Sequence, residues 1–82
     1  MRRYPQVLVN VEVADREALA SSSEVWDAVA VSEGTLGQEG RVLVRASGTE
    51  PLVRVMVEAQ TEQIASEHAE AVAGVVRARL GA

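Results

Sequence analysis

Three short segments of this sequence place valine at every second position. Valine occupies positions 7, 9, 11 and 13 in QVLVNVEV (6–13), and RVLVRA (41–46) and VRVMVEA (53–59) alternate valine or alanine in the same way. Side chains of a β-strand point alternately to the two faces of a sheet. Each segment therefore predicts a strand with one buried face and one mostly wet face, and the chain is constrained to a sheet covered on one side.

Two other segments carry apolar residues at helical spacing. We expect one helix from about Glu24 to Leu36, stopped by Gly37, and a second from Thr61, as its N-cap, to about Leu80. The order strand, helix, strand, strand, helix predicts an α+β fold. This is a two-layer domain with a small, mainly antiparallel sheet and two helices on one face. The place of any fourth strand stays open.

Composition excludes several classes of function. A chain of 82 residues is one small domain or a piece of a larger protein. Cysteine is absent, so disulfides and thiolate metal sites are excluded, and His68 is the single histidine. The net charge is −4 and the only aromatic residues are Tyr4 and Trp26, so we expect neither nucleic acid nor a membrane as a partner.

Three single residues on the expected helices have structural rather than catalytic interpretations. We expect His68 to lie at the edge of the helix–sheet packing rather than to act as a catalytic base. Trp26 is expected in the core or in packing against another domain. Gly74, inside the second helix, predicts a close approach of that helix to the sheet.

Two arginines flank the turn SGTEP (47–51). Arg45 and Arg54 both lie on the strand faces opposite the valines, so a hairpin would bring their guanidinium groups together on the uncovered face. Two such cations repel unless a carboxylate or an anion joins them. Glu50 or Glu58 could be that carboxylate, and a phosphate could be the anion.

The turn itself has the composition of an anion site. Ser47 and Thr49 offer hydroxyl donors, and Gly48 can take a positive φ that lets the backbone approach a ligand. Successive N–H groups in such a turn form an anion-binding nest, and Pro51 stiffens the loop. The same residues are also typical of an ordinary hairpin turn between exposed arginines. The sequence therefore leaves both interpretations open, an anion-binding site and a simple turn.

A longer stretch carries a family resemblance. RASGTEPLVRVMVEA (45–59), preceded by GRVLV (40–44), closely resembles the C-terminal domain signature of the α-D-phosphohexomutases, and YPQVLVNV (4–11) resembles the start of that domain. Gly48 and the continuation Glu50-Pro51-Leu52 are most similar to the phosphoglucosamine mutases. Phosphomannomutases and phosphoglucomutases often carry a different residue at position 48. The resemblance implies a small sheet with helices on one side, like the TATA-binding-protein fold.

The resemblance implies a function as well. Residues 1–82 would be the C-terminal domain of a four-domain, bacterial, cytoplasmic enzyme that interconverts glucosamine 6-phosphate and glucosamine 1-phosphate through a bisphosphate. That reaction supplies amino-sugar metabolism and cell-wall precursors. A phosphoserine and magnesium would come from the other three domains, so this chain would hold no catalytic or metal-binding residue and would be inactive alone. The residues implied to hold the substrate's phosphate are Arg45, Ser47, Gly48, Thr49 and Arg54.

Three alternatives remain beside this interpretation. The chain could be the corresponding domain of a phosphomannomutase or phosphoglucomutase. It could be a ferredoxin-like regulatory module that binds amino acids, or a structural interaction domain that uses its open sheet face. The arginine pair around SGTEP distinguishes them, because a regulatory module has no need of two guanidinium groups converging on one turn.

Overall fold

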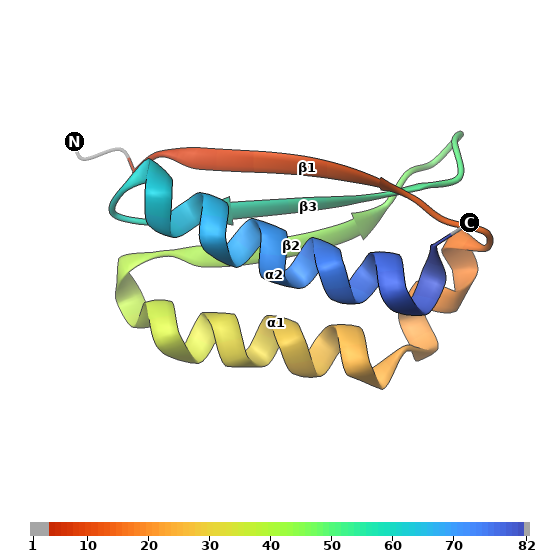
Figure 1. Ribbon diagram of the computed structural model, residues 1–82, viewed down its shortest axis with the longest axis horizontal. Coiled ribbons are helices and arrows are strands. Elements are labelled where there is room, and N and C mark those ends of the chain that lie inside the picture. Colours follow the sequence, from red (N-terminus) through yellow and green to blue (C-terminus); the bar gives the residue numbers. More distant parts are fainter. Residues whose placement is uncertain (1–3, 82) are drawn as a thin grey trace.

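The structure is a computed structural model that describes residues 4–81. Within these residues three strands form one antiparallel sheet, β1 (Gln6–Glu12), β2 (Arg41–Ala46) and β3 (Leu52–Glu58), in the spatial order β1-β3-β2 (Figure 1). The strands coincide with the three valine segments to within one residue at each end. Val13 follows β1 and forms an isolated bridge with Gly81 instead of extending the strand.

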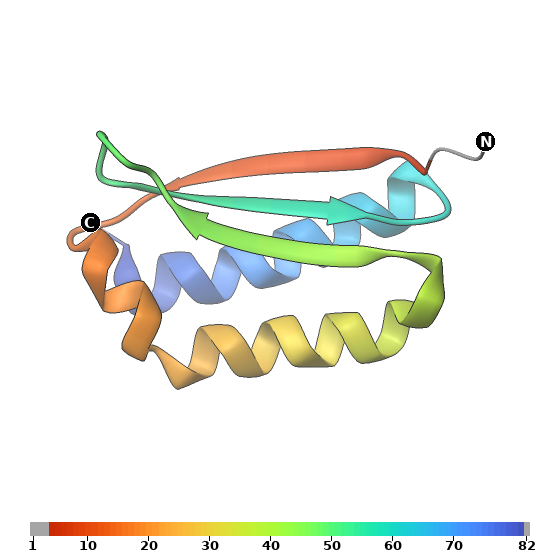
Figure 2. The same ribbon diagram turned by 180° about the vertical axis from the view of Figure 1, so that it is seen from behind.

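Two helices, α1 (Ser23–Leu36) and α2 (Glu62–Leu80), cover one face of the sheet and leave the other open (Figures 1 and 2). Short 3-10 helices precede and follow α1, η1 (Arg16–Ser21) and η2 (Gly37–Glu39). The predicted α+β architecture, with two helices on one face, is confirmed. The β2–β3 loop projects beyond one end of the two layers.

The core lies between the sheet and the helices. The central strand β3 contributes Val53, Val55 and Val57, each with none of its surface exposed. Helix α2 lies against β1 and β3 through small residues such as Ala69 and Ala73, which let it pack closely. The alternating valines are therefore the buried face that their spacing predicts.

Helix α2 begins at the predicted cap. The Thr61 hydroxyl accepts a hydrogen bond from the Ile64 N–H at 3.1 Å. We expect Thr61→Ala to lower the free energy of unfolding by about 1 kcal/mol, because that N–H loses its partner. In a domain of this size the melting temperature would fall by about 4–8 °C, while Thr61→Ser should melt close to the parent. Equal melting of Thr61→Ala and the parent would contradict the capping role.

One expectation about a single residue is confirmed in part and a second is wrong. One ring nitrogen of His68 has a partner, as expected, but that partner lies on α1 and not on the sheet: Nδ1 is 2.9 Å from the Oγ of the buried Ser32. A Cβ on Gly74 would meet nothing within 4 Å, so this glycine does not serve a close approach to the sheet. Helical spacing places both residues on a helix face but does not say which neighbouring element that face meets.

Trp26 ties α1 to η1. Its indole N–H donates to the Leu19 carbonyl oxygen at 2.9 Å, and 39% of the residue stays exposed. The tryptophan is therefore only partly a core residue of this unit.

No helix within residues 4–81 combines the length and the apolar character needed to cross a bilayer.

Candidate functional site: an arginine pair beside the β2–β3 loop

The hairpin of β2 and β3 brings the two predicted arginines together. Arg45 is the register partner of Arg54, and Asn10 of β1 is the partner of Arg54 on its other side. All three residues are exposed on the open face of the sheet. Neither guanidinium group forms an ion pair with any residue that the structure describes. Two like charges therefore lie directly opposite each other, an arrangement that destabilises a sheet.

A third arginine on the same face behaves differently. Arg41, at the far end of β2, lies 3.3 Å from a carboxylate oxygen of Glu58, its register partner on β3. Glu58 also accepts a hydrogen bond from the Gln6 side chain at 3.1 Å. The hypothesis that Glu58 joins Arg45 to Arg54 is therefore wrong, because this carboxylate is paired at the opposite end of the strands.

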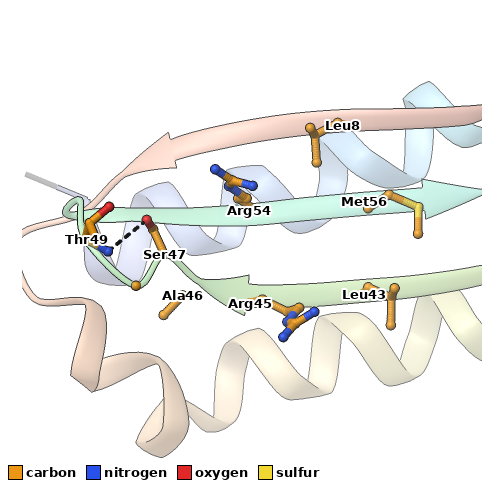
Figure 3. Close-up of a pocket in the computed structure, with 9 residues that line it drawn as sticks. Leu8, Leu43, Arg45, Ala46, Ser47, Thr49, Arg54 and Met56 are labelled. Atoms are coloured by element: carbon orange, nitrogen blue, oxygen red, sulfur yellow. Dashed lines mark hydrogen bonds between the residues drawn. The ribbon is translucent and has the colours of Figure 1, made fainter.

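The β2–β3 loop is held by the Ser47 hydroxyl. Its Oγ accepts hydrogen bonds from the backbone N–H groups of Glu50 at 3.2 Å and Thr49 at 3.4 Å, the latter drawn in Figure 3. The Ser47 N–H donates to the Leu52 carbonyl oxygen at 2.8 Å, which closes the loop. The Pro51 carbonyl oxygen accepts a hydrogen bond from Val13 at 2.9 Å, which anchors the loop beside the end of β1.

Two details of the predicted anion nest are not seen in this conformation. Among residues 4–81 positive φ is found at Gly37 and not at Gly48, and a Cβ on Gly48 would meet nothing within 4 Å. Two of the loop N–H groups point at Ser47 rather than at a free space. The reason is local, because a serine hydroxyl two or three residues before an N–H competes for it.

The arginines and the loop line one shallow pocket of about 560 Å³. Figure 3 views it on the open face of the sheet, with Arg54 on β3, Arg45 on β2 and Ser47 and Thr49 in the loop at one end. The structure therefore brings all five predicted phosphate residues to one pocket. Its lining is Leu8, Leu43, Arg45, Ala46, Ser47, Gly48, Thr49, Arg54 and Met56.

Four lining residues were not predicted as part of a site. They are apolar residues from all three strands: Leu8, Leu43, Ala46 and Met56. Leu8, Leu43 and Met56 have the strand parity of the arginines, and this was the signal that could have identified them. Parity assigns a face, but only the register between β1 and β3 shows that Leu8 lies beside Met56.

The pocket does not suit a metal ion. No group of three or more His, Cys, Asp or Glu side chains within residues 4–81 is arranged to hold one. The pocket's charged side chains are cationic, which disfavours Mg²⁺. The residues that line this pocket therefore fit an anion rather than a cation.

The chain is similar to a known enzyme family over most of its length. Residues 8–75 match the family described as phosphoglucomutase/phosphomannomutase, C-terminal domain. It is 56% identical over 82 residues to a phosphoglucosamine mutase of Frankia alni, covering 100% of this chain and 18% of that protein. A phosphoglucosamine mutase of Geobacillus kaustophilus is 49% identical over 81 residues, with 99% and 18% covered. The chain thus spans less than a fifth of the length of these relatives.

Solved structures of the same kind superpose on it. The N-acetylphosphoglucosamine mutase of Aspergillus fumigatus matches with a TM-score of 0.83 and 33% identity, over 96% of this chain and 16% of that one. Its S69A variant in complex with glucose 1,6-bisphosphate matches with a TM-score of 0.84 and 33% identity, over the same shares. An N-acetylglucosamine-phosphate mutase of the α-D-phosphohexomutase superfamily, in its substrate complex, gives 0.77 and 34%, over 89% and 15%.

Proposed function

The chain belongs to the phosphoglucomutase/phosphomannomutase family, whose C-terminal domain it matches, and from this premise we propose that it is the substrate-phosphate-binding domain of a phosphoglucosamine mutase. The whole protein would interconvert glucosamine 6-phosphate and glucosamine 1-phosphate in the bacterial cytoplasm. A phosphoserine and magnesium would act from its other domains. The bacterial relatives bearing that name, at 49–56% identity, favour this enzyme over a phosphomannomutase or phosphoglucomutase.

One observation carries the proposal: Arg45 and Arg54 are register partners with no counter-charge among the described residues. Such a pair lowers the stability of the hairpin, because the two cations repel each other across neighbouring strands. A local arrangement that works against folding is typical of a functional site. A bound dianion would reverse the repulsion, since both guanidinium groups could then donate to it.

The neighbouring loop supports a phosphate in particular. The Ser47 Oγ accepts two hydrogen bonds within the loop, and because a hydroxyl can donate as well as accept, we assign Ser47 as a donor to a phosphate oxygen in the proposed site. Thr49 adds a second hydroxyl, and the open space around Gly48 leaves the backbone accessible to a ligand. Phosphate offers several acceptor oxygens, which matches this number of donors.

The residues of this chain would bind and orient the substrate, and they would make or break no covalent bond. Arg45 and Arg54 would hold the phosphate that is not reacting, and the loop would fix its position relative to the strands. An anchor of this kind converts binding into orientation of the distant reacting group. Bond-making would belong to the phosphoserine of another domain.

Titration of the 82-residue chain with inorganic phosphate tests the proposal. We expect amide chemical shifts to move at Ser47, Gly48 and Thr49, with a Kd around millimolar, because the remaining domains are absent. Arg45→Gln should weaken binding at least about tenfold, because a charge-assisted bond contributes about 1.5–3 kcal/mol and each 1.4 kcal/mol is a factor of about ten. The matched control is Arg41→Gln, which removes an arginine from the same strand and face and should leave the Kd within about twofold.

Two results would overturn the assignment. Shifts confined to other regions at saturating phosphate would place the anion elsewhere. Equal weakening by Arg45→Gln and Arg41→Gln would mean that phosphate senses only the net charge of the sheet face. If a free amino acid shifts the site and phosphate does not, the chain is a regulatory module instead.

A further inference from the structure

The open face of the sheet is organised in rows that run across the three strands. One row contains Asn10, Arg54 and Arg45, and the row at the other end contains Gln6, Glu58 and Arg41. The middle row is apolar and is formed by Leu8, Met56 and Leu43, which follow one another across β1, β3 and β2 (Figure 3). A band of hydrocarbon therefore lies directly beside the arginine pair.

Both ends of the apolar row are open to water. Leu8 is 58% exposed and Leu43 is 42% exposed, whereas the valines on the other face of β3 are fully buried. Single exposed apolar residues are ordinary, but three in adjacent register positions form a continuous surface. All three also line the pocket that contains the arginines. The row and the cations thus belong to one concave surface.

The two polar rows differ in what they can still bind. At the far row Glu58 lies between the Arg41 guanidinium and the Gln6 amide and contacts both, so its charges are satisfied within the protein. The near row has two arginines without a carboxylate partner in the described chain. A ligand on this face would place its anionic group at Arg45 and Arg54 and extend from there over the apolar row.

The spacing of the rows suits a phosphate ester. Residues on one face of a strand repeat every second position, about 6.6–6.8 Å apart. The apolar row lies one such step from the arginine row, so a sugar ring joined to a phosphate at the arginines would extend over it. Sugar rings present C–H groups on their faces, and these pack on Met and Leu side chains while the hydroxyl groups remain in water.

We propose that Leu8, Met56 and Leu43 form a platform for the carbon skeleton of a phosphate ester whose phosphate is held by Arg45 and Arg54. This inference rests on the proposed phosphate-binding function and adds to it a contact that distinguishes a sugar phosphate from inorganic phosphate. The row is a specificity element, because it binds the part of the ligand that inorganic phosphate lacks. Met56 makes the largest part of the contact with the carbon skeleton, because it lies at the centre of the row and next to Arg54 on the same face of β3.

The test compares two ligands on the 82-residue chain by chemical-shift titration, inorganic phosphate and glucosamine 6-phosphate. We expect the sugar phosphate to bind about three- to tenfold more tightly and to shift the Met56 methyl and the Leu8 and Leu43 methyl signals. Met56→Gln keeps the length of the side chain but makes it polar. It should remove most of that preference while leaving the Kd for inorganic phosphate within about twofold.

A control variant separates the platform from a general loss of surface hydrophobicity. Val31 on α1 is 70% exposed and lies outside the pocket, so Val31→Thr should keep the preference for the sugar phosphate. Melting curves of both variants confirm that each is folded under the titration conditions.

The failure of this inference is distinct from the failure of the proposed function. Equal affinity for both ligands in the parent chain, with binding still dependent on Arg45, would overturn the platform and leave the phosphate site standing. Equal loss of both ligands in Met56→Gln would also overturn it. Binding that does not depend on Arg45 would overturn both proposals. Self-association that Met56→Gln abolishes would assign the face to a second copy of the chain and overturn the platform.

Discussion

Arg54→Ala is expected to lower kcat/KM at least about tenfold in a full-length phosphoglucosamine mutase that contains this chain. The guanidinium group can donate two hydrogen bonds to a phosphate, and each charge-assisted bond contributes about 1.5–3 kcal/mol. Each 1.4 kcal/mol corresponds to a factor of about ten. If the anchor also positions the reacting phosphate, its loss lowers kcat together with kcat/KM. If the anchor binds the ground state and the transition state equally, its loss raises KM and leaves kcat unchanged.

The fold should survive this substitution. Arg54 is exposed and lies opposite Arg45, so its removal relieves a repulsion and loses few contacts. Arg54→Lys should recover only part of the activity, because an ammonium group cannot make the bidentate contact. Arg41→Ala, on the same face but paired with Glu58, is the matched control and should keep kcat/KM within about twofold.

The measurement is steady-state kinetics with glucosamine 6-phosphate and glucosamine 1-phosphate, alongside a thermal melt. Parent-like kinetics in Arg54→Ala would exclude the anchor. A melt showing that Arg54→Ala is largely unfolded at the assay temperature would do the same, because the loss would then have a structural origin.

The relation between valine spacing and the sheet explains why so much of the fold was predictable. A period of two assigns each residue of a strand to a face without any long-range information. A short turn between Ala46 and Leu52 forces β2 and β3 to pair as a hairpin, and pairing near the turn brings Arg45 opposite Arg54. The central feature of the candidate site therefore follows from local sequence alone.

The features that could not be predicted depend on contacts between distant segments. The central position of β3 requires β1, more than forty residues earlier, to pair on its other edge. That pairing aligns Leu8 with Met56 and completes the apolar row. His68 likewise meets Ser32 because α1 and α2 pack side by side, which no spacing within either helix encodes. The Ser47 hydrogen bonds depend on a side-chain rotation that composition does not specify.

Gly40 lies at the start of β2, where the backbone of the neighbouring strand comes closest. A Cβ at this position would lie 2.2 Å from the Glu58 carbonyl oxygen and 3.2 Å from the Ala59 Cα. The φ of 178° is extended backbone that any residue adopts, so the obstacle is the contact and not the conformation. Because both obstructing atoms are backbone, the two strands would have to separate at the end where Arg41 meets Glu58.

We therefore expect Gly40→Ala to lower the free energy of unfolding by about 2–3 kcal/mol, a typical cost of forcing an extra carbon into a packed region. In a domain of this size that corresponds to a fall in melting temperature of roughly 10 °C or more. The matched substitution is Gly74→Ala in α2, where a Cβ meets nothing within 4 Å. It should raise stability by about 0.5–1 kcal/mol, because alanine favours a helix interior over glycine. Urea unfolding of the 82-residue chain measures both, and similar midpoints for Gly40→Ala and the parent would show that β2 and β3 do not approach as closely as this structure has them.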